Sequence, residues 1–126
     1  MDEWLNVYDS LTVLISDMRS FIKKVIPILG TEVEHNRYIY RFTMGSNSVS
    51  IEAEPYKVSI RINTIRESSY VELNKEHIRE AFVNLPYLLK IYDYLIGEVE
   101  KVAKKERNNY EKIKSKLLPY AVSKEL

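Results

Sequence analysis

The chain contains no cysteine, only three glycines and only two histidines. Without cysteine there can be no disulfide, no thiolate metal ligand and no thiol nucleophile. Three ungrouped glycines cannot form a glycine-rich phosphate-binding loop. His35 and His77 fall in different predicted elements and lack the spacing of metal ligands. The sequence therefore predicts no metal site, no cofactor and no catalytic residues, and we expect the protein not to be an enzyme.

The sequence also lacks the features of a secreted or membrane protein. No apolar run approaches the ~20 residues that a membrane-spanning helix needs. The N-terminus, Met-Asp-Glu-Trp, is acidic and does not resemble a signal peptide. Together with the absence of cysteine, this indicates a cytoplasmic protein with no membrane partner. A length of 126 residues suits one domain.

Net charge is close to zero, at +1, but it is distributed unevenly. Residues 1–35 carry −3, residues 36–66 carry +3, residues 67–96 carry −2 and residues 97–126 carry +3. Strong non-specific nucleic-acid binders are usually markedly basic, so the total argues against that class of protein. Association depends on local charge, so the charge of the two basic regions bears more on nucleic-acid binding than the net charge does.

Apolar residues at steps of three and four predict an amphipathic N-terminal helix. Its stripe consists of Trp4, Tyr8, Leu11, Ile15, Met18, Ile22 and Val25. Pro27 is expected to end or kink this helix near Ile26, and Gly30 fits a C-terminal stop.

From Thr31 the period changes to two, which indicates strands. Four strands are predicted, over residues 37–44, 48–54, 57–63 and 70–73. Their short connections, with turn signals at Gly45-Ser46-Asn47 and Arg66-Glu67-Ser68, favour an antiparallel meander. The predicted fold is therefore α+β, with a four-stranded sheet between helices.

Helical periodicity returns after Asn74, which is expected to cap the next helix. Pro86 should kink or divide this helix near Asn84, and Gly97 should weaken it again. We expect residues 1–97 to form the core and residues 98–126 a helical arm of the same single domain.

The arm is expected to be either part of a long kinked helix or one member of a helical pair that turns at Asn108-Asn109. Its apolar seam is narrow, as in a coiled coil or a two-helix contact. The arm could fold back on its own domain, but we favour a homodimer, because the N-terminal helix and the first part of the arm can already cover one face of the sheet. The predicted dimerisation residues are Val99, Ala103, Tyr110, Ile113 and Leu117.

If the apolar strand residues pack inward, the other face of the sheet carries cations separated mainly by hydroxyl groups. These cations are Arg37, Arg41, Lys57 and Arg61, with Arg66 in a neighbouring turn. Such a face could follow a phosphate backbone, and Tyr56 and Tyr70 could stack on bases. Tyr38 and Tyr40 are ambiguous, since their row could itself be the stacking face. The alternative is an ordinary solvated strand face, where arginine and lysine are common.

The junction Ser69-Tyr70-Val71-Glu72-Leu73-Asn74-Lys75-Glu76-His77-Ile78 is similar to the strand-to-helix junction of Whirly-type and related transcriptional-coactivator single-strand binders. The order of elements resembles ThermoDBP, a single-stranded DNA-binding family of some thermophilic archaea. This resemblance implies binding beside the sheet through aromatic residues flanked by basic ones, and dimerisation through the C-terminal helix. The residues in such positions would be Arg37, Tyr38, Tyr40, Arg41, Lys57 and Arg61. The Lys/Glu-rich tail fits a thermophile or its virus.

The sequence thus predicts a dimeric, non-enzymatic binder of single-stranded DNA or RNA with little sequence preference. The alternative is a protein–protein interaction module, such as an adaptor, an assembly subunit or an inhibitor, that binds a protein partner through its helices.

Overall fold

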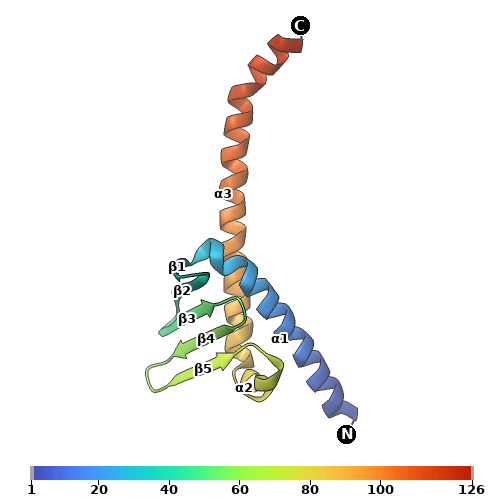
Figure 1. Cartoon of the computed structure of the whole chain (residues 1–126), viewed down its shortest axis with the longest axis vertical. Coiled ribbons are helices and arrows are strands. Elements are labelled where there is room, and N and C mark those ends of the chain that lie inside the picture. Colours follow the sequence, from blue (N-terminus) through green and yellow to red (C-terminus); the bar gives the residue numbers. More distant parts are fainter. Residues whose placement is uncertain (1, 126) are drawn as a thin grey trace. The chain divides into compact units, whose positions relative to one another are not determined.

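A computed structural model describes the backbone of residues 2–125 and the side-chain surroundings of residues 3–120 (Figure 1). The elements are α1 (Asp2–Leu29), β1 (Thr31–Glu34), β2 (Arg37–Met44), β3 (Asn47–Ala53), β4 (Val58–Asn63), β5 (Ser68–Glu72), the 3₁₀ helix η1 (Lys75–His77), α2 (Ile78–Val83) and α3 (Leu85–Glu125). The chain divides into two compact units, Met1–Tyr92 and Asp93–Leu126, so α3 contributes to both. The α+β class and the order of helix, sheet and long helix are confirmed.

The sheet is an antiparallel meander in which spatial order follows chain order, β1-β2-β3-β4-β5. The expected number of four strands is wrong, because β1 pairs with β2 across a two-residue turn at His35 and Asn36. Asn36 has a φ of 62°, a left-handed conformation that asparagine tolerates without glycine. All four β1 residues are exposed. Because no face of β1 is buried, its sequence does not alternate between apolar and polar residues, and the strand could not be recognised from such a pattern.

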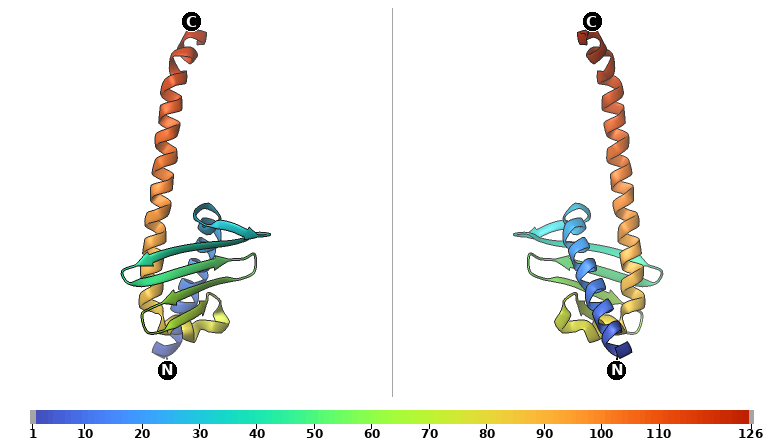
Figure 2. Two further views of the ribbon diagram at one scale, coloured as in Figure 1. Left: turned by 90° about the vertical axis from the view of Figure 1, so that its left-hand side faces the viewer. Right: turned by 90° about the vertical axis from the view of Figure 1, so that its right-hand side faces the viewer.

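One face of the sheet is covered by α1 and by the first turns of α3, as the two views of Figure 2 show. The middle of the helical stripe predicted for α1 is the central part of this core: Ile15, Met18 and Ile22 are at most 1% exposed, as is Ile26 beside them. The facing strand residues Ile51, Ile60 and Ile62 are buried to the same extent. The core also includes Val49, Val71, Leu73, Leu88 and Ile91. The stripe does not pack along its whole length, because Trp4 and Tyr8 are 75% and 50% exposed.

The helix boundaries follow the prolines only in part. Helix α1 continues to Leu29 rather than ending near Ile26, with Pro27 in its last turn. The division expected at Asn84 is confirmed, since α2 ends just before it and α3 begins just after it. Pro86 then lies in the first turn of α3, where a missing backbone N–H removes no helical hydrogen bond.

The expected alternative of a helical hairpin is wrong, because α3 runs from Leu85 to Glu125 through Asn108 and Asn109. Asparagine lowers helix propensity by less than glycine does, and the flanking lysines and glutamates favour the helix. Two adjacent asparagines are therefore not sufficient to end it.

Two glycine substitutions test how tightly α1 approaches the sheet. A Cβ at Gly30 would lie 2.8 Å from the backbone oxygen of Ile39 and 2.9 Å from that of Ile26. We expect Gly30→Ala to destabilise the fold by about 1–3 kcal/mol, because neither backbone oxygen can move independently. Urea unfolding followed by circular dichroism would measure the change.

Gly97→Ala is the matched control, because a Cβ at Gly97 meets nothing within 4 Å. It should leave stability unchanged or raise it by up to about 1 kcal/mol, as alanine is the better helix former. A Gly30→Ala protein as stable as the wild type would contradict the close approach.

Candidate nucleic-acid interface

Four side chains form a continuous row across the face of the sheet opposite the helices. Arg41 pairs with Ser50, Ser50 with Arg61, and Arg61 with Tyr70, on β2, β3, β4 and β5. Directly opposed residues of antiparallel strands point to the same side of a sheet. We call these four residues the arginine row. Both arginines are exposed, and Tyr70 is 45% exposed.

The two guanidinium groups of the arginine row keep their charge available. Among the described residues, neither Arg41 nor Arg61 forms an ion pair with a carboxylate. Arg61 lies 5.7 Å from the centre of the Tyr70 ring, within cation–π range. Arg41 and Arg61 are two strands apart, or roughly 10 Å at the usual strand spacing.

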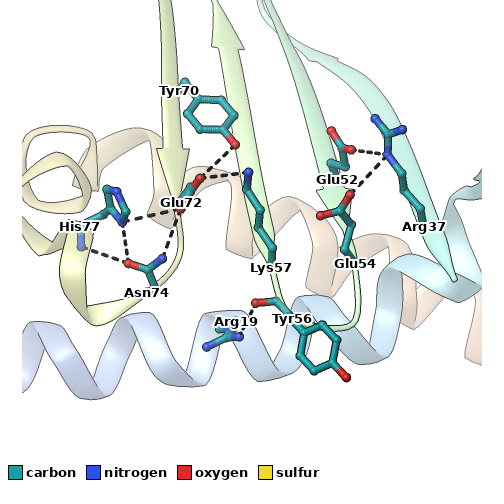
Figure 3. A network of polar contacts seen from close by, with 10 residues as sticks. All are labelled: Arg19, Arg37, Glu52, Glu54, Tyr56, Lys57, Tyr70, Glu72, Asn74 and His77. Atoms are coloured by element: carbon teal, nitrogen blue, oxygen red, sulfur yellow. Dashed lines mark hydrogen bonds and ion pairs between the residues drawn. The ribbon is translucent and has the colours of Figure 1, made fainter.

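The cation expected at Arg37 is neutralised by carboxylates of β3 and of the chain just after it (Figure 3). Its Nε donates a hydrogen bond to Glu52 and lies 3.6 Å from a carboxylate oxygen of Glu54. The hydrogen bond and charge of Glu52 raise the pKa of Arg37. Arg37 is thus an ion-paired residue, not a free cation of the face.

Lys57, the residue just before β4, is also paired. Its Nζ lies 3.1 Å from Glu72 Oε1 and 5.8 Å from the centre of the Tyr70 ring. Contact with Tyr70, and then with Glu72, raises the pKa of Lys57. The other Glu72 oxygen accepts a hydrogen bond from Asn74 and lies 3.7 Å from His77 Nδ1. The hydrogen bond from Lys57 is the main reason that the pKa of Glu72 is lowered.

The cap after β5 holds this network in place. Asn74 Oδ1 accepts hydrogen bonds from the backbone N–H groups of Glu76 and His77, both at 3.1 Å. The predicted cap is confirmed, although it begins the 3₁₀ turn η1 before α2. Leu73 and Ile78, on either side of the turn, are both buried. The cap therefore fixes the end of β5 and with it the carboxylate of Glu72.

Tyr38 and Tyr40 do not lie on the arginine row. Alternation along β2 directs them to the helix-covered face, where both are half-buried. Tyr38 lines a hollow with Lys23 and Pro27 of α1, and the ring of Tyr40 lies 5.4 Å from that of Phe42. Neither of these two tyrosines, whose placement the sequence left ambiguous, therefore lies on the face of the sheet that carries the arginine row.

Tyr56 and Arg66 lie in connections at opposite ends of the sheet. Tyr56 follows β3 and is 90% exposed, while its backbone oxygen accepts a hydrogen bond from Arg19 at 2.9 Å. Arg66 lies in the connection between β4 and β5, which follows the last residue pair of these strands, Asn63 and Ser68. Neither belongs to the arginine row, and Arg66 is the nearer to it in register.

Ser59, which alternation along β4 places on the same side as Arg61, is only 5% exposed. In register it stands between Glu52 and Glu72, whose longer side chains flank it. The open face thus has two parts, an ion-paired part around Ser59 and the arginine row. Sequence reasoning missed the neutralising role of these carboxylates, although hairpin register would have placed Glu52 and Glu54 beside Arg37.

The predicted dimerisation residues all lie on α3, in the unit Asp93–Leu126. Tyr110, Ile113 and Leu117 are 61%, 58% and 59% exposed, Ala103 is exposed and Val99 is half-buried. The seam is therefore apolar and largely open to solvent.

Among residues 3–120, no cluster of three or more histidine, aspartate or glutamate side chains could hold a metal ion. In the same part of the chain, no helix combines the length and the apolar character required to cross a bilayer. In comparisons with known proteins, no family model, curated protein or solved structure matches the chain. The case for a function accordingly depends on the geometry of the chain itself.

The lowered pKa of Glu72 makes a prediction about stability and pH. A carboxyl group whose pKa is lower in the folded state stabilises the fold above its unfolded pKa of about 4.5, and this contribution is lost as pH falls through the folded value. Glu72→Gln should therefore be less stable than the wild type at pH 6, and the difference should shrink by pH 3. Urea unfolding of both proteins at the two pH values would measure this, and a difference independent of pH would contradict the pairing with Lys57.

Proposed function

We propose that this chain binds single-stranded DNA or RNA through the arginine row, with little preference for sequence and without catalysis. The observation that carries the proposal is the row itself: two unpaired guanidinium groups, a small hydroxyl residue between them and an exposed tyrosine ring at one end. Arginines supply phosphate contacts, and a tyrosine ring supplies a surface on which any base can stack.

The surroundings of the row favour a single strand over a duplex. On the side of the row away from Glu52 and Glu72, the next strand residues of this face are neutral and polar. They are Thr43, Ser48, Asn63 and Ser68, paired across the strands. This leaves the backbone of a flexible strand free to approach the sheet closely. In a duplex the bases are stacked inside and cannot reach the face of Tyr70, whereas unpaired bases can.

The ion-paired part of the face limits the site. Glu52, Glu54 and Glu72 balance Arg37 and Lys57, so that side contributes little net attraction for phosphate. A phosphate chain would therefore follow the arginine row and the Arg66 turn rather than spread over the whole sheet. Few phosphate contacts imply modest affinity for each chain, and dimerisation through the α3 seam, also part of the proposal, would raise it by linking two sites. We also propose that the protein acts in the cytoplasm.

A second candidate, a protein–protein interaction module, is favoured by an apolar hollow between α1 and α2. The hollow has a volume of about 220 Å³ and is lined by Trp4, Val7, Tyr8, Leu11, Ile78, Arg79 and Phe82. Trp4 is 75% exposed and Phe82 is 50% exposed. Large exposed aromatic residues around a hollow are typical of surfaces that bind another chain.

The double variant Arg41→Ala/Arg61→Ala tests the nucleic-acid proposal. We expect its Kd for a labelled oligothymidine to rise at least about tenfold, or about 1.4 kcal/mol, at low salt. Losing two phosphate contacts should also flatten the plot of log K against log salt by about 1.4, at ~0.7 per contact on a single strand. Fluorescence anisotropy at several salt concentrations measures both quantities.

The matched control is Lys24→Ala/Lys90→Ala, which removes two exposed cations from α1 and α3 and changes net charge equally. It should bind as the wild type does, apart from a small effect of total charge. If both double variants bind equally well, the arginine row is not the site. If the wild type itself does not retain oligonucleotide at low salt, the interaction-module proposal is preferred.

Tyr70 offers a separate test of base stacking. Tyr70→Ala should lose about 1–3 kcal/mol of binding free energy, the usual value for one stacked base. Tyr70→Phe keeps the ring and loses only the hydroxyl, which contacts Lys57 and forms a hydrogen bond of 3.4 Å with Glu72, so it should bind nearly as the wild type. Anisotropy titrations with the three proteins measure the difference, and equal losses for alanine and phenylalanine would exclude a stacking role.

A further inference from the structure

The arm of α3 carries an apolar seam with a regular seven-residue period. Alternating steps of three and four residues connect Ile96, Val99, Ala103, Glu106, Tyr110, Ile113, Leu117 and Tyr120. In coiled-coil notation Ile96, Ala103, Tyr110 and Leu117 occupy a positions, and the other four occupy d positions. Glu106 is the one charged residue of the seam.

The seam is exposed where its side chains are largest. Tyr110, Ile113, Leu117 and Tyr120 are between 58% and 71% exposed. The rest of this surface is mainly charged or polar, including Lys104, Lys105, Lys112, Lys114 and Lys116. A helix with this pattern gains stability by packing its seam against a second helix of the same period.

We infer that the arm pairs with the arm of a second copy in antiparallel orientation, with a two-fold axis close to Asn108. The inference extends the dimerisation included in the proposed function. In this register Glu106 faces the partner's Tyr110 and Ala103 faces the partner's Ile113. Towards the ends, Val99 faces the partner's Leu117 and Ile96 faces the partner's Tyr120.

Orientation follows first from Glu106 and Ala103. A parallel, in-register pair would place the two Glu106 carboxylates against each other inside an apolar seam, where like charges are unfavourable. It would also place Ala103 against Ala103 and leave a gap. The antiparallel pair lets the hydroxyl of Tyr110 donate to the carboxylate, and it packs the small alanine against the larger isoleucine.

Charges on the edges of the seam favour the same orientation. The e positions are Glu100, Arg107 and Lys114, and in an antiparallel pair e residues face e residues. Glu100 then lies opposite the partner's Lys114, and the two-fold axis creates this pair twice. The Arg107 side chains approach each other near the axis, but their long stems allow the guanidinium groups to extend into solvent.

In a parallel pair the e residues would face g residues instead. Arg107 would then lie opposite Val102, and Lys114 opposite Asn109, so neither would meet an opposite charge. The antiparallel arrangement is the one that pairs Glu100 with the oppositely charged Lys114.

Burial argues against sliding the pair by one heptad towards Tyr92. Sliding the pair by one heptad would set Glu106 against the partner's Ala103 and would require Tyr92 in the seam. The ring of Tyr92 is already in edge-on contact with Phe21, at 5.0 Å between ring centres. The same slide would also set Tyr120 against Leu89, which, like Tyr92, belongs to the unit Met1–Tyr92. The register centred near Asn108 covers the large exposed residues and does not use Tyr92.

Single-cysteine variants test the orientation, because the chain contains no native cysteine. Asn109→Cys, on the g edge beside the axis, should form a disulfide-linked dimer within minutes of mild oxidation. Ala103→Cys should not, since its two copies would be about 15 Å apart along the axis. An equimolar mixture of Ala103→Cys and Ile113→Cys should again give the linked dimer. Non-reducing electrophoresis measures the linked fraction.

Light scattering on the cysteine-free protein gives the oligomeric state before oxidation, and we expect twice the chain mass of 14.9 kDa. Ile113→Glu/Leu117→Glu should return it to a single chain while circular dichroism still shows a folded sheet. Self-linking of Ala103→Cys would overturn the inference in favour of parallel arms. A single-chain mass, or a dimer in which Asn109→Cys does not link, would overturn it too. None of these outcomes involves oligonucleotide, so failure here is distinct from failure of the arginine row.

Discussion

The fold depends on the apolar stripe of α1 lying flat against one face of the sheet. Met18, Ile22 and Ile26 are completely buried there, as are Ile51 and Ile60 opposite them. Because strand side chains alternate between faces, burying this set sends every second residue to the other side. A slip of one residue in register would place arginines in the core, so the same packing that stabilises the domain also fixes the position of the open face.

The parts of the structure that could be predicted are those with a strong period. The three-four rhythm identified α1, the two-residue rhythm identified β2, β3 and β4, and the cap at Asn74 and the division at Asn84 followed from local chemistry. These signals are reliable because each depends on residues that are close together in the sequence. The exposure of Arg41 and Arg61 could be predicted for the same reason, from alternation alone.

What could not be predicted depends on partners far along the chain or on weak propensities. Strand β1 buries none of its residues, so it has no apolar pattern. The neutralisation of Lys57 required the register that brings Glu72 of β5 beside it. Helix α3 continues through Asn108 because asparagine is less favourable in a helix than the best helix formers by only roughly a few tenths of a kcal/mol per residue. The periodicity of apolar residues does not report so small a difference.

The near-zero net charge has a structural counterpart on the open face. Its acids and bases are not mixed evenly but separated into a compensated part and the arginine row. A compensated surface beside a cationic one keeps the attraction for polyanions local, and it lowers the repulsion that a uniformly basic sheet would experience during folding. The protein thereby combines a basic site with an almost neutral chain.

The meander order of the sheet has a kinetic consequence. Every strand pairs with its neighbour in the chain, and left-handed residues at Asn36 and Gly45 close two of the connections in tight turns. Loops this short cost little entropy to close, and domains rich in local contacts fold quickly. The hairpins can therefore form one after another as the chain emerges from the ribosome. The docking of α1 on strands that follow it in the chain closes longer loops than any of the hairpins do, so it carries the larger entropy cost.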